Sequence, residues 1–275
     1  MGTDAHLLTV RGNDDGPALG YSAFVPGIAG ARTLVLIHGN TRHTGKMFRA
    51  FLPQAAELGL AIIVPTFPRE GFRGYQRLAG SAGPMAARQA LDDTLLDAQE
   101  VLGIATDRMT LCGFSGGAQF AQRYALFSPG RIHRLVVASA GYYTHLDPEL
   151  RYPYGVGPSA LSGGLAPDVD EFLRLPVHVL VGEQDVDRDE GLRVGVRLDR
   201  SQGRNRLARA LHWVDHLEAA AADRGMRSRV SFDVLPGTAH SFSSAVHRGD
   251  LVARVLAFAH PAGASVNRIP LGGPL

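Results

Sequence analysis

The sequence predicts a protein of the α/β class, built on an open, mostly parallel sheet with helices on both faces. Short continuous runs rich in Val, Ile and Leu recur along the chain, and such runs are typical of strands buried on both faces. They are residues 33–37, 61–64, 109–112, 134–138 and 177–181. Helical patterns lie between these runs, and this alternation indicates right-handed crossovers in one sheet.

The elements follow in order along the chain. Residues 6–11 and 20–25 predict an edge hairpin, with a turn at 13–17, where the sequence is NDDGP. Apolar residues then recur at helical spacing in three segments, 46–58, 85–102 and 116–127. The C-terminal part predicts a helix at 204–224, a strand at 229–235 and a helix at 249–259. The whole pattern corresponds to a sheet of about eight strands.

Two segments do not fit the alternation. Residues 141–173 are rich in Gly, Pro and Tyr, and residues 186–203 are rich in charge. Both are longer than ordinary loops between strands and helices, and long loops of this kind often shape a pocket. We therefore expect a single domain over residues 1–275 with two lid-like insertions.

The near balance of basic and acidic residues argues against a strongly charged surface on this protein. The chain holds 28 basic and 26 acidic residues, a formal charge of +2, so neither nucleic acid nor an anionic membrane is an expected partner. Arginines crowd residues 188–209, interleaved with acidic residues, and this predicts a solvated surface of mixed sign. The oligomeric state stays open.

The cellular compartment is predicted from cysteine use and from the absence of targeting signals. Cys112 is the single cysteine, which excludes an internal disulfide and fits a reducing compartment. No signal-peptide pattern begins the sequence, and no run approaches the ~18 apolar residues of a membrane span. The expectation is a cytoplasmic protein with Cys112 as a buried, inert thiol.

The most specific motif is GFSGG at residues 113–117, which lies between a predicted strand and a predicted helix. A nucleophile elbow turns sharply from strand to helix and needs small residues two positions either side of the nucleophile. Gly113 and Gly117 satisfy this requirement, so Ser115 is the candidate nucleophile. The start of the following helix directs backbone N–H groups towards an oxyanion beside it.

A second backbone donor is expected from the loop HGNT, which follows the strand at 33–37. We assign the oxyanion hole to the backbone N–H groups of Asn40 and Gly116. His38, before the glycine of this loop, is expected to pack beneath the loop and to bond to backbone. Arg42 and His43 follow as expected exposed residues.

Chain order selects the general base among eleven histidines. His240 follows the last predicted strand, at the sheet edge where Ser115 also lies, and the order Ser, acid, His is the one expected for this arrangement. His247 is the nearest competitor. His212 and His216 are spaced for a metal on one helix, but the Glu of a HExxH motif is missing, so no metal is proposed.

Asp185 is the candidate acid, because it follows the strand at 177–181 and can accept a hydrogen bond from the base. Asp187 and Glu183 lie close to it in sequence. Asp147, after the preceding strand, is a weaker alternative. A faint calcium-loop pattern begins at Asp185, but its glycine is one place late and Val196 occupies the twelfth position.

Taken together, HGN, GFSGG, GEQD and GTAH resemble the α/β-hydrolase superfamily over residues 20–260. The arrangement is similar to the esterase and polyhydroxybutyrate-depolymerase-like branch, and to the dienelactone hydrolases. The resemblance implies a cofactor-free serine hydrolase that cleaves a carboxylic ester through an acyl-enzyme, with a small ester or related acyl compound as substrate. Its departure from small esterases is the insertion at 186–203.

Other functions on the same scaffold stay open at this point. They are an amidase or small peptidase, a cofactor-free haloperoxidase, a carbon–carbon hydrolase, and an inactive hydrolase-like binding protein. Five aromatic residues could either line an aromatic pocket or pack in the core, namely Tyr142, Tyr143, Tyr152, Tyr154 and Trp213.

Overall fold

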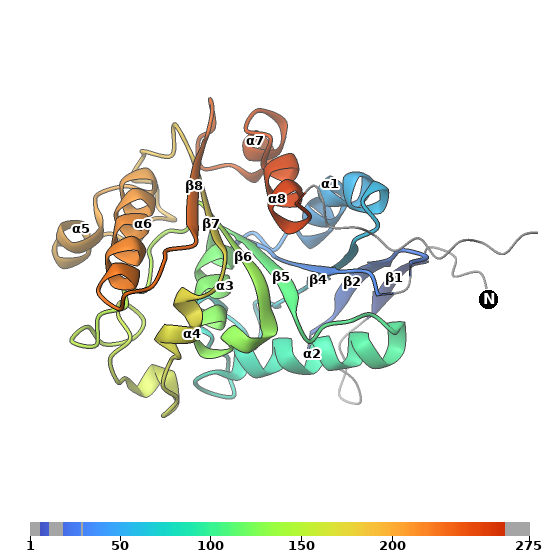
Figure 1. The fold of residues 1–275 in the computed structure, drawn as a ribbon, viewed down its shortest axis with the longest axis horizontal. Helices are drawn as coiled ribbons and strands as arrows, with labels where there is room; N and C mark the ends of the chain where they lie inside the picture. The colour runs from blue at the N-terminus through green and yellow to red at the C-terminus, as the bar shows by residue number, and fades with distance from the viewer. Residues whose placement is uncertain (1–5, 11–18, 29, 262–275) are drawn as a thin grey trace, which may run out of the picture.

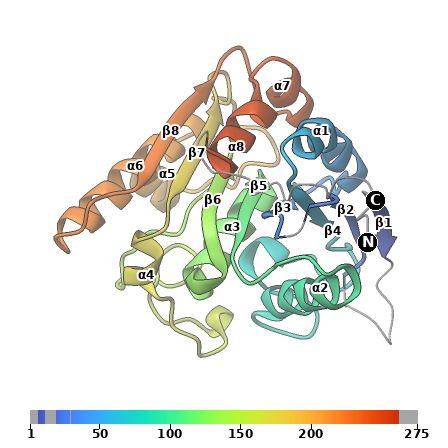
Figure 2. The same ribbon diagram turned by 45° about the vertical axis from the view of Figure 1, so that its right-hand side comes forward.

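A computed structural model describes residues 6–10, 19–28 and 30–261 of the chain (Figure 1). Its centre is one sheet of eight strands in the order β1-β2-β4-β3-β5-β6-β7-β8. The strands are β1 (His6–Val10), β2 (Tyr21–Val25), β3 (Thr33–Ile37), β4 (Ala61–Pro65), β5 (Met109–Phe114), β6 (Ile132–Ala138), β7 (Val177–Gly182) and β8 (Val230–Leu235). Figure 2 shows them fanning out from β8 to β1 in a twisted sheet.

The pairing divides the sheet into a parallel body and an antiparallel edge. Strand β1 pairs antiparallel with β2, and β2 antiparallel with β4, whereas every later neighbour pairs in parallel. Parallel strands end at a common edge, so the loops after β3, β5, β7 and β8 meet there. All the candidate site residues lie at this edge, each in the segment that follows its strand.

Helices cover both faces of the sheet (Figure 1). The eight α-helices among the described residues are α1 (Thr44–Glu57), α2 (Ala86–Leu102), α3 (Gly116–Phe127), α4 (Val169–Leu173), α5 (Val196–Gln202), α6 (Arg206–Ala222), α7 (Phe242–His247) and α8 (Leu251–Ala259). Three short 3₁₀ helices join them, namely η1 (Tyr75–Arg77), η2 (Pro129–Arg131) and η3 (Ala160–Ser162). One apolar core lies between the sheet and α2, α3 and α6, and the other between the sheet and α1 and α8.

Most of the predicted elements are confirmed to within a few residues. The predicted hairpin is β1 and β2, while its predicted turn at 13–17 lies outside the described residues. Three short helices were not predicted, namely α4, α5 and α7. Each has only five to seven residues, too few for a helical period to stand out from the loop around it.

Segment 141–157 covers polar residues of helix α3 and so helps to bury this helix. Gln122 and Arg123 are polar residues of α3, yet both are fully buried. Gln122 accepts a hydrogen bond from Thr144 N–H at 3.0 Å, and Arg123 Nε donates to Thr144 Oγ1 at the same distance. The first predicted insertion therefore covers the polar side of the central helix.

The arginine-rich stretch at 188–209 was predicted as a solvated surface, and this prediction is wrong at two positions. Arg206 and Arg209 are fully buried. Arg209 donates to the carbonyl oxygen of Gly141 at 2.6 Å and to Asp199 Oδ1 at 2.9 Å. Buried guanidinium groups persist only with such partners, and sequence spacing alone does not reveal the partners.

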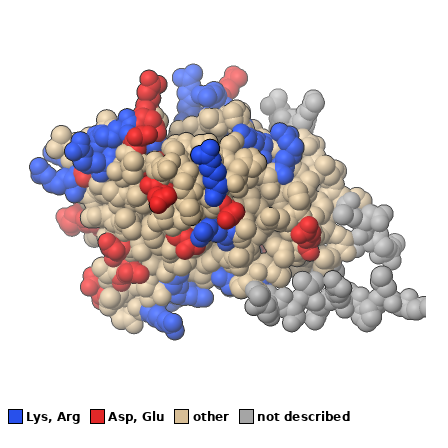
Figure 3. Space-filling model, turned by 90° about the horizontal axis from the view of Figure 1, so that it is seen from above, with Lys and Arg blue, Asp and Glu red and all other residues tan. Residues whose placement is uncertain are grey.

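The surface carries both charge signs. On the face shown in Figure 3, Lys and Arg side chains are interspersed with Asp and Glu, and neither sign covers the face. Cys112 is buried, and burial raises the pKa of its thiol to about 12, as expected for an inert cysteine. Across residues 6–10, 19–28 and 30–261, the helices lack the length and apolar character that a membrane span requires.

Candidate active site

Ser115 lies at a strained turn between β5 and α3. Its backbone has φ 55° and ψ −114°, in the left-handed half of φ space that a non-glycine residue rarely adopts. A Cβ on Gly113 would overlap the carbonyl of Gly117, and a Cβ on Gly117 would overlap the carbonyl of Ile37. The two glycines therefore permit the sharp turn that raises Ser115 above the sheet edge.

His240 reaches Ser115 from the loop that follows β8. Its Nε2 lies 3.0 Å from Ser115 Oγ. The imidazole stacks on the ring of Phe114, with centroids 5.8 Å apart and planes 20° apart. The hydrogen bond and the stacking together fix the position of the ring beside the serine.

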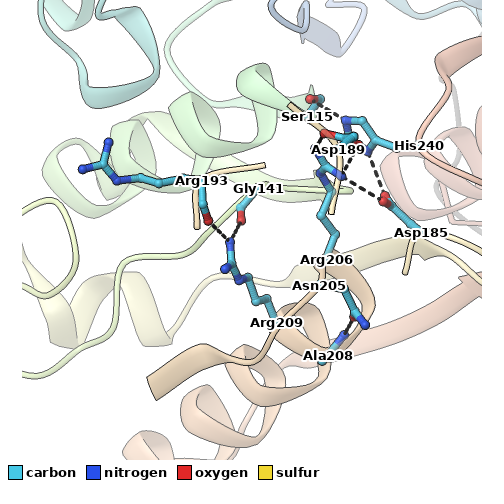
Figure 4. A network of polar contacts seen from close by, with 10 residues as sticks. All are labelled: Ser115, Gly141, Asp185, Asp189, Arg193, Asn205, Arg206, Ala208, Arg209 and His240. Carbon is cyan, nitrogen blue, oxygen red and sulfur yellow. Dashed lines mark hydrogen bonds and ion pairs between the residues drawn. The ribbon is translucent and has the colours of Figure 1, made fainter. Parts of the chain in front are cut away.

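Asp185 completes a hydrogen-bonded chain (Figure 4). Its Oδ2 lies 2.8 Å from His240 Nδ1, and its side chain is fully buried. An ionised carboxylate only accepts hydrogen bonds, so Nδ1 carries the proton and Nε2 is left to accept from the Ser115 hydroxyl. This tautomer is the one in which a histidine can take the proton of a serine.

Backbone bonds between two loops bring Asp185 to His240. Glu183 N–H donates to the carbonyl of Leu235 at 3.0 Å, and Gln184 N–H donates to that of Thr238 at 2.9 Å. The Glu183 carboxylate accepts from Gly237 N–H at 2.9 Å. The loop after β7 thus continues the pairing of β7 with β8, and the acid and the base arrive side by side.

The competing residues lie elsewhere. Asp187 is exposed, and Asp147 accepts a hydrogen bond from the backbone N–H of Glu149 at 2.9 Å. His247 is exposed at the end of α7. Of the aspartates considered from the sequence, only Asp185 is hydrogen-bonded to His240 within the described residues.

Arg206 and Asp189 are two site residues that sequence reasoning missed. Arg206 Nη1 lies 3.3 Å from Asp185 Oδ1, the oxygen that faces away from His240. The same guanidinium binds both carboxylate oxygens of Asp189, at 2.7 and 2.8 Å. The Arg206 hydrogen bond and charge lower the pKa of Asp189 below its usual value. Figure 4 shows this chain of charges leading to Ser115.

The predicted oxyanion loop borders Ser115 closely. A Cβ on Gly39 would lie 3.4 Å from Ser115 Cβ, and one on Gly116 would overlap the Asn40 side chain. The Asn40 amide oxygen accepts a hydrogen bond from Gln76 Nε2. Gly116 begins α3, so its N–H has no intrahelical acceptor. The structure therefore places both predicted oxyanion-hole residues beside the serine.

His38 packs beneath this loop, as predicted. Phe67 N–H donates to its Nε2 at 3.0 Å, and its Nδ1 lies 2.8 Å from the carbonyl oxygen of Gly39. Both ring nitrogens are therefore engaged by backbone in the neutral form. Burial lowers the pKa of His38 to about 4. Tyr75 Oη, which donates to the carbonyl of His38 at 2.8 Å, braces the loop from η1.

A pocket of about 390 Å³ opens above Ser115 and His240. The loop after β3 and the first turn of α1 form one wall, and the start of α7 forms another. Gly191, from the second predicted insertion, also lines it, whereas the first insertion contributes no lining residue. That these segments act as a lid stays a prediction. The candidate aromatic residues pack elsewhere, as in the stacked pair Tyr143 and Trp213, with ring centroids 4.7 Å apart.

No cluster of three metal-ligating side chains with suitable geometry occurs in the part of the chain that the structure describes. His212 and His216 were considered as a metal pair from the sequence. Both rings stack with His145, and His216 Nε2 accepts a hydrogen bond from Leu146 N–H at 2.7 Å. This bond occupies the nitrogen lone pair that a metal would need.

The fold is shared with solved hydrolases. Poly(aspartic acid) hydrolase-1 from Sphingomonas sp. KT-1 superposes with a TM-score of 0.75 at 22% identity, covering 94% of this chain and 100% of that chain. A poly(3-hydroxybutyrate) depolymerase from Bordetella parapertussis gives 0.71 at 25% identity, covering 92% and 94%. The chain has the α/β-hydrolase fold.

A hydrolase of lower identity superposes over a similar length. An S-formylglutathione hydrolase from Agrobacterium tumefaciens gives a TM-score of 0.59 at 13% identity, covering 94% of this chain and 96% of that chain. The sequence matches no protein-family model and no curated protein. The likeness is therefore one of architecture, and the chemistry has to be argued from the residues themselves.

Proposed function

We propose that this α/β-hydrolase is a serine hydrolase that cleaves a carboxylic ester through an acyl-enzyme. One observation carries the proposal: Ser115, His240 and Asp185 form a continuous hydrogen-bonded chain at the base of the pocket. This is the constellation that makes a serine hydroxyl nucleophilic.

In the proposed mechanism, His240 Nε2 takes the hydroxyl proton of Ser115 as Oγ attacks the ester carbonyl. Asp185 stabilises the imidazolium that forms. His240 then gives the proton to the leaving alcohol, and the acyl group remains on Ser115. A water molecule loses a proton to His240 and attacks the acyl-enzyme, and the proton returns to Ser115 as the acid departs.

The negative charge of each tetrahedral intermediate develops beside Ser115. The backbone N–H groups of Asn40 and Gly116 are the proposed donors to this oxygen, and the N-terminal end of α3 adds its positive dipole end. Two residues hold this loop in place. Gln76 donates a hydrogen bond to the Asn40 side chain, and Tyr75 donates one to the carbonyl of His38.

The proposed substrate is a small ester or related acyl compound. The pocket is of the size that small-molecule sites have. The similar structures include a poly(3-hydroxybutyrate) depolymerase and an S-formylglutathione hydrolase, and these names support acyl transfer over the other chemistries of the scaffold. An amide substrate would use the same residues, and paired p-nitrophenyl ester and p-nitroanilide assays separate the two.

The proposal is tested by labelling the purified protein with a fluorophosphonate and locating the adduct by peptide mass spectrometry. The adduct is expected on Ser115, and it is expected to disappear in Ser115→Ala and His240→Ala. Esterase turnover should fall by on the order of 10³-fold or more in both variants. Ser243, which also lines the pocket, gives the matched control Ser243→Ala. Full turnover in folded Ser115→Ala would disprove the proposal.

A further inference from the structure

Of the two basic side chains that line the pocket above Ser115, one forms no ion pair within the described residues. Lys46 and Arg206 are the pocket's two cationic lining residues apart from histidines, and no Asp or Glu stands among the lining residues of the described chain. Arg206 is already committed, because its guanidinium binds Asp189 and Asp185. Lys46 is therefore the charge that a bound substrate would meet.

Lys46 differs from the other basic residues in kind and in surroundings. It is the single lysine of the sequence, and all the other basic residues are arginines. Within residues 6–10, 19–28 and 30–261 it takes part in no ion pair. In this described part of the chain no carboxylate pairs with its ammonium, so the ammonium can bind an anionic group of a ligand.

The position of Lys46 does not stabilise the fold. It lies in the first turn of α1, a turn without an acidic residue. A cation near a helix N-terminus faces the positive end of the helix dipole and is unfavourable there, whereas an anion would be favoured. An anionic group placed at this wall would interact with Lys46 and with the helix end together.

Apolar side chains form the rest of the surroundings. Met47, Phe114 and Phe242 line the same pocket. A substrate that fits both features has a short apolar chain next to its ester and a single negative charge at the end of that chain. One ammonium balances a monoanion, and bidentate arginine forks, which suit phosphate better, are absent from this wall in the described chain.

We propose that the pocket selects esters that carry a carboxylate, and that Lys46 binds this carboxylate. The inference rests on the proposed ester hydrolysis and names its substrate class. It predicts that, of two esters of similar length, the one that carries a carboxylate is the better substrate. Because Lys46 is exposed, the effect is expected to be several-fold and to weaken with salt.

The test compares kcat/KM for the p-nitrophenyl monoester of adipic acid with kcat/KM for methyl p-nitrophenyl adipate, a neutral ester of similar length. The wild-type protein should prefer the acidic ester by about 2- to 5-fold at low salt. Lys46→Met should lose this ratio and Lys46→Glu should invert it. Arg49→Met is the matched control, because Arg49 is exposed on α1 but does not line the pocket. It should keep the wild-type ratio.

A ratio that is unchanged in Lys46→Met, or lost equally in Arg49→Met, would overturn the inference. If no ester is turned over, the proposed function has failed, and a second measurement still decides the charge site. Monomethyl adipate should slow acylation of Lys46 by an amine-reactive reagent, and dimethyl adipate should not, as read from the labelled peptide. Equal rates with both compounds would show that no carboxylate binds there.

Discussion

Arg206 and Asp185 form a buried ion pair in which Nη1 lies 3.3 Å from Oδ1. Asp185 thus accepts hydrogen bonds from two side chains. Arg206 binds one of its oxygens, and His240 binds the other. Asp189 binds the same guanidinium and neutralises it. Helix α6 contributes Arg206 and the insertion before it contributes Asp189, so these two segments place charges beside the Asp185–His240 pair.

Removing the Asp189 charge should shift the pH dependence of kcat/KM. In Asp189→Asn the Arg206 charge has Asp185 as its remaining carboxylate partner, so it opposes the imidazolium of His240 more strongly. The acid limb of the profile should move to lower pH. Arg206→Met should move it to higher pH if the protein folds. Other charged or polar groups near this pair, Arg209 and Tyr143 among them, are unchanged in both variants.

The control for this prediction is Asp187→Asn, which removes an exposed carboxylate from the same loop. It should leave the acid limb within error of the wild-type position. Shifts of the Asp189 and Asp187 variants in the same direction and by the same amount would indicate a general surface effect and contradict the prediction.

Asp185→Asn should cut turnover by up to ~10⁴-fold while the fold persists. The amide can donate to His240 Nδ1 and so stabilise the wrong tautomer, which no longer accepts the Ser115 proton. The measurement is kcat, together with circular dichroism to verify folding. Asp147→Asn is the matched control. Near-normal turnover of Asp185→Asn would require a different acid.

Substitutions at two adjacent glycines should separate folding from catalysis. In Gly117→Ala the new Cβ meets the backbone carbonyl of Ile37, which cannot move cheaply, so folded yield should fall sharply. In Gly116→Ala the Cβ meets the movable Asn40 side chain and lies 2.7 Å from Tyr75 Oη. This variant should fold, with kcat reduced by about 10- to 100-fold.

Thermal unfolding and kcat of both glycine variants check this expectation. Gly130→Ala gives the control, because a Cβ there meets no atom within 4 Å. Equal folded yields of the Gly117→Ala and Gly130→Ala proteins would contradict the close packing of the elbow.

Protein stability should fall as the pH drops from about 6.5 towards 4. Burial lowers the pKa of His38 to about 4, so the unfolded chain binds a proton in this range that the folded protein does not. The stability is fully present above the unfolded pKa and is lost as the pH falls through this window. One such group contributes a slope of at most about 1.4 kcal/mol per pH unit.

Urea unfolding at pH 7.0 and 5.0 measures this slope. His38→Gln should be less stable at pH 7.0 but lose less stability between the two values than the wild type. His145, whose pKa burial also lowers to about 4, should supply part of the slope that remains. An unchanged slope in His38→Gln would mean that His38 is not the group responsible.

The sequence determined the sheet, the order of its strands along the chain and the candidate residues at its carboxyl edge. Buried parallel strands are continuous apolar runs, and the GFSGG turn has a steric requirement that only small residues meet, so both are visible in one dimension. Ser115 and His240 follow from this local signal and from chain order. Asp185 was also predicted from its place after β7. Only the tertiary structure, however, distinguished it from Glu183 and Asp187, its two acidic neighbours in sequence.

Only the tertiary structure decided which charges meet. Arg206 looked like one of many surface arginines, because its partner Asp189 is 17 residues away and its burial arises from the packing of α6 against the loop after β7. In the sequence Lys46 is one residue of a predicted helix, and only the structure places it at the wall of the pocket. Hydrogen bonds and ion pairs between distant segments leave no period in the sequence, so their chemistry appears only when the chain is folded.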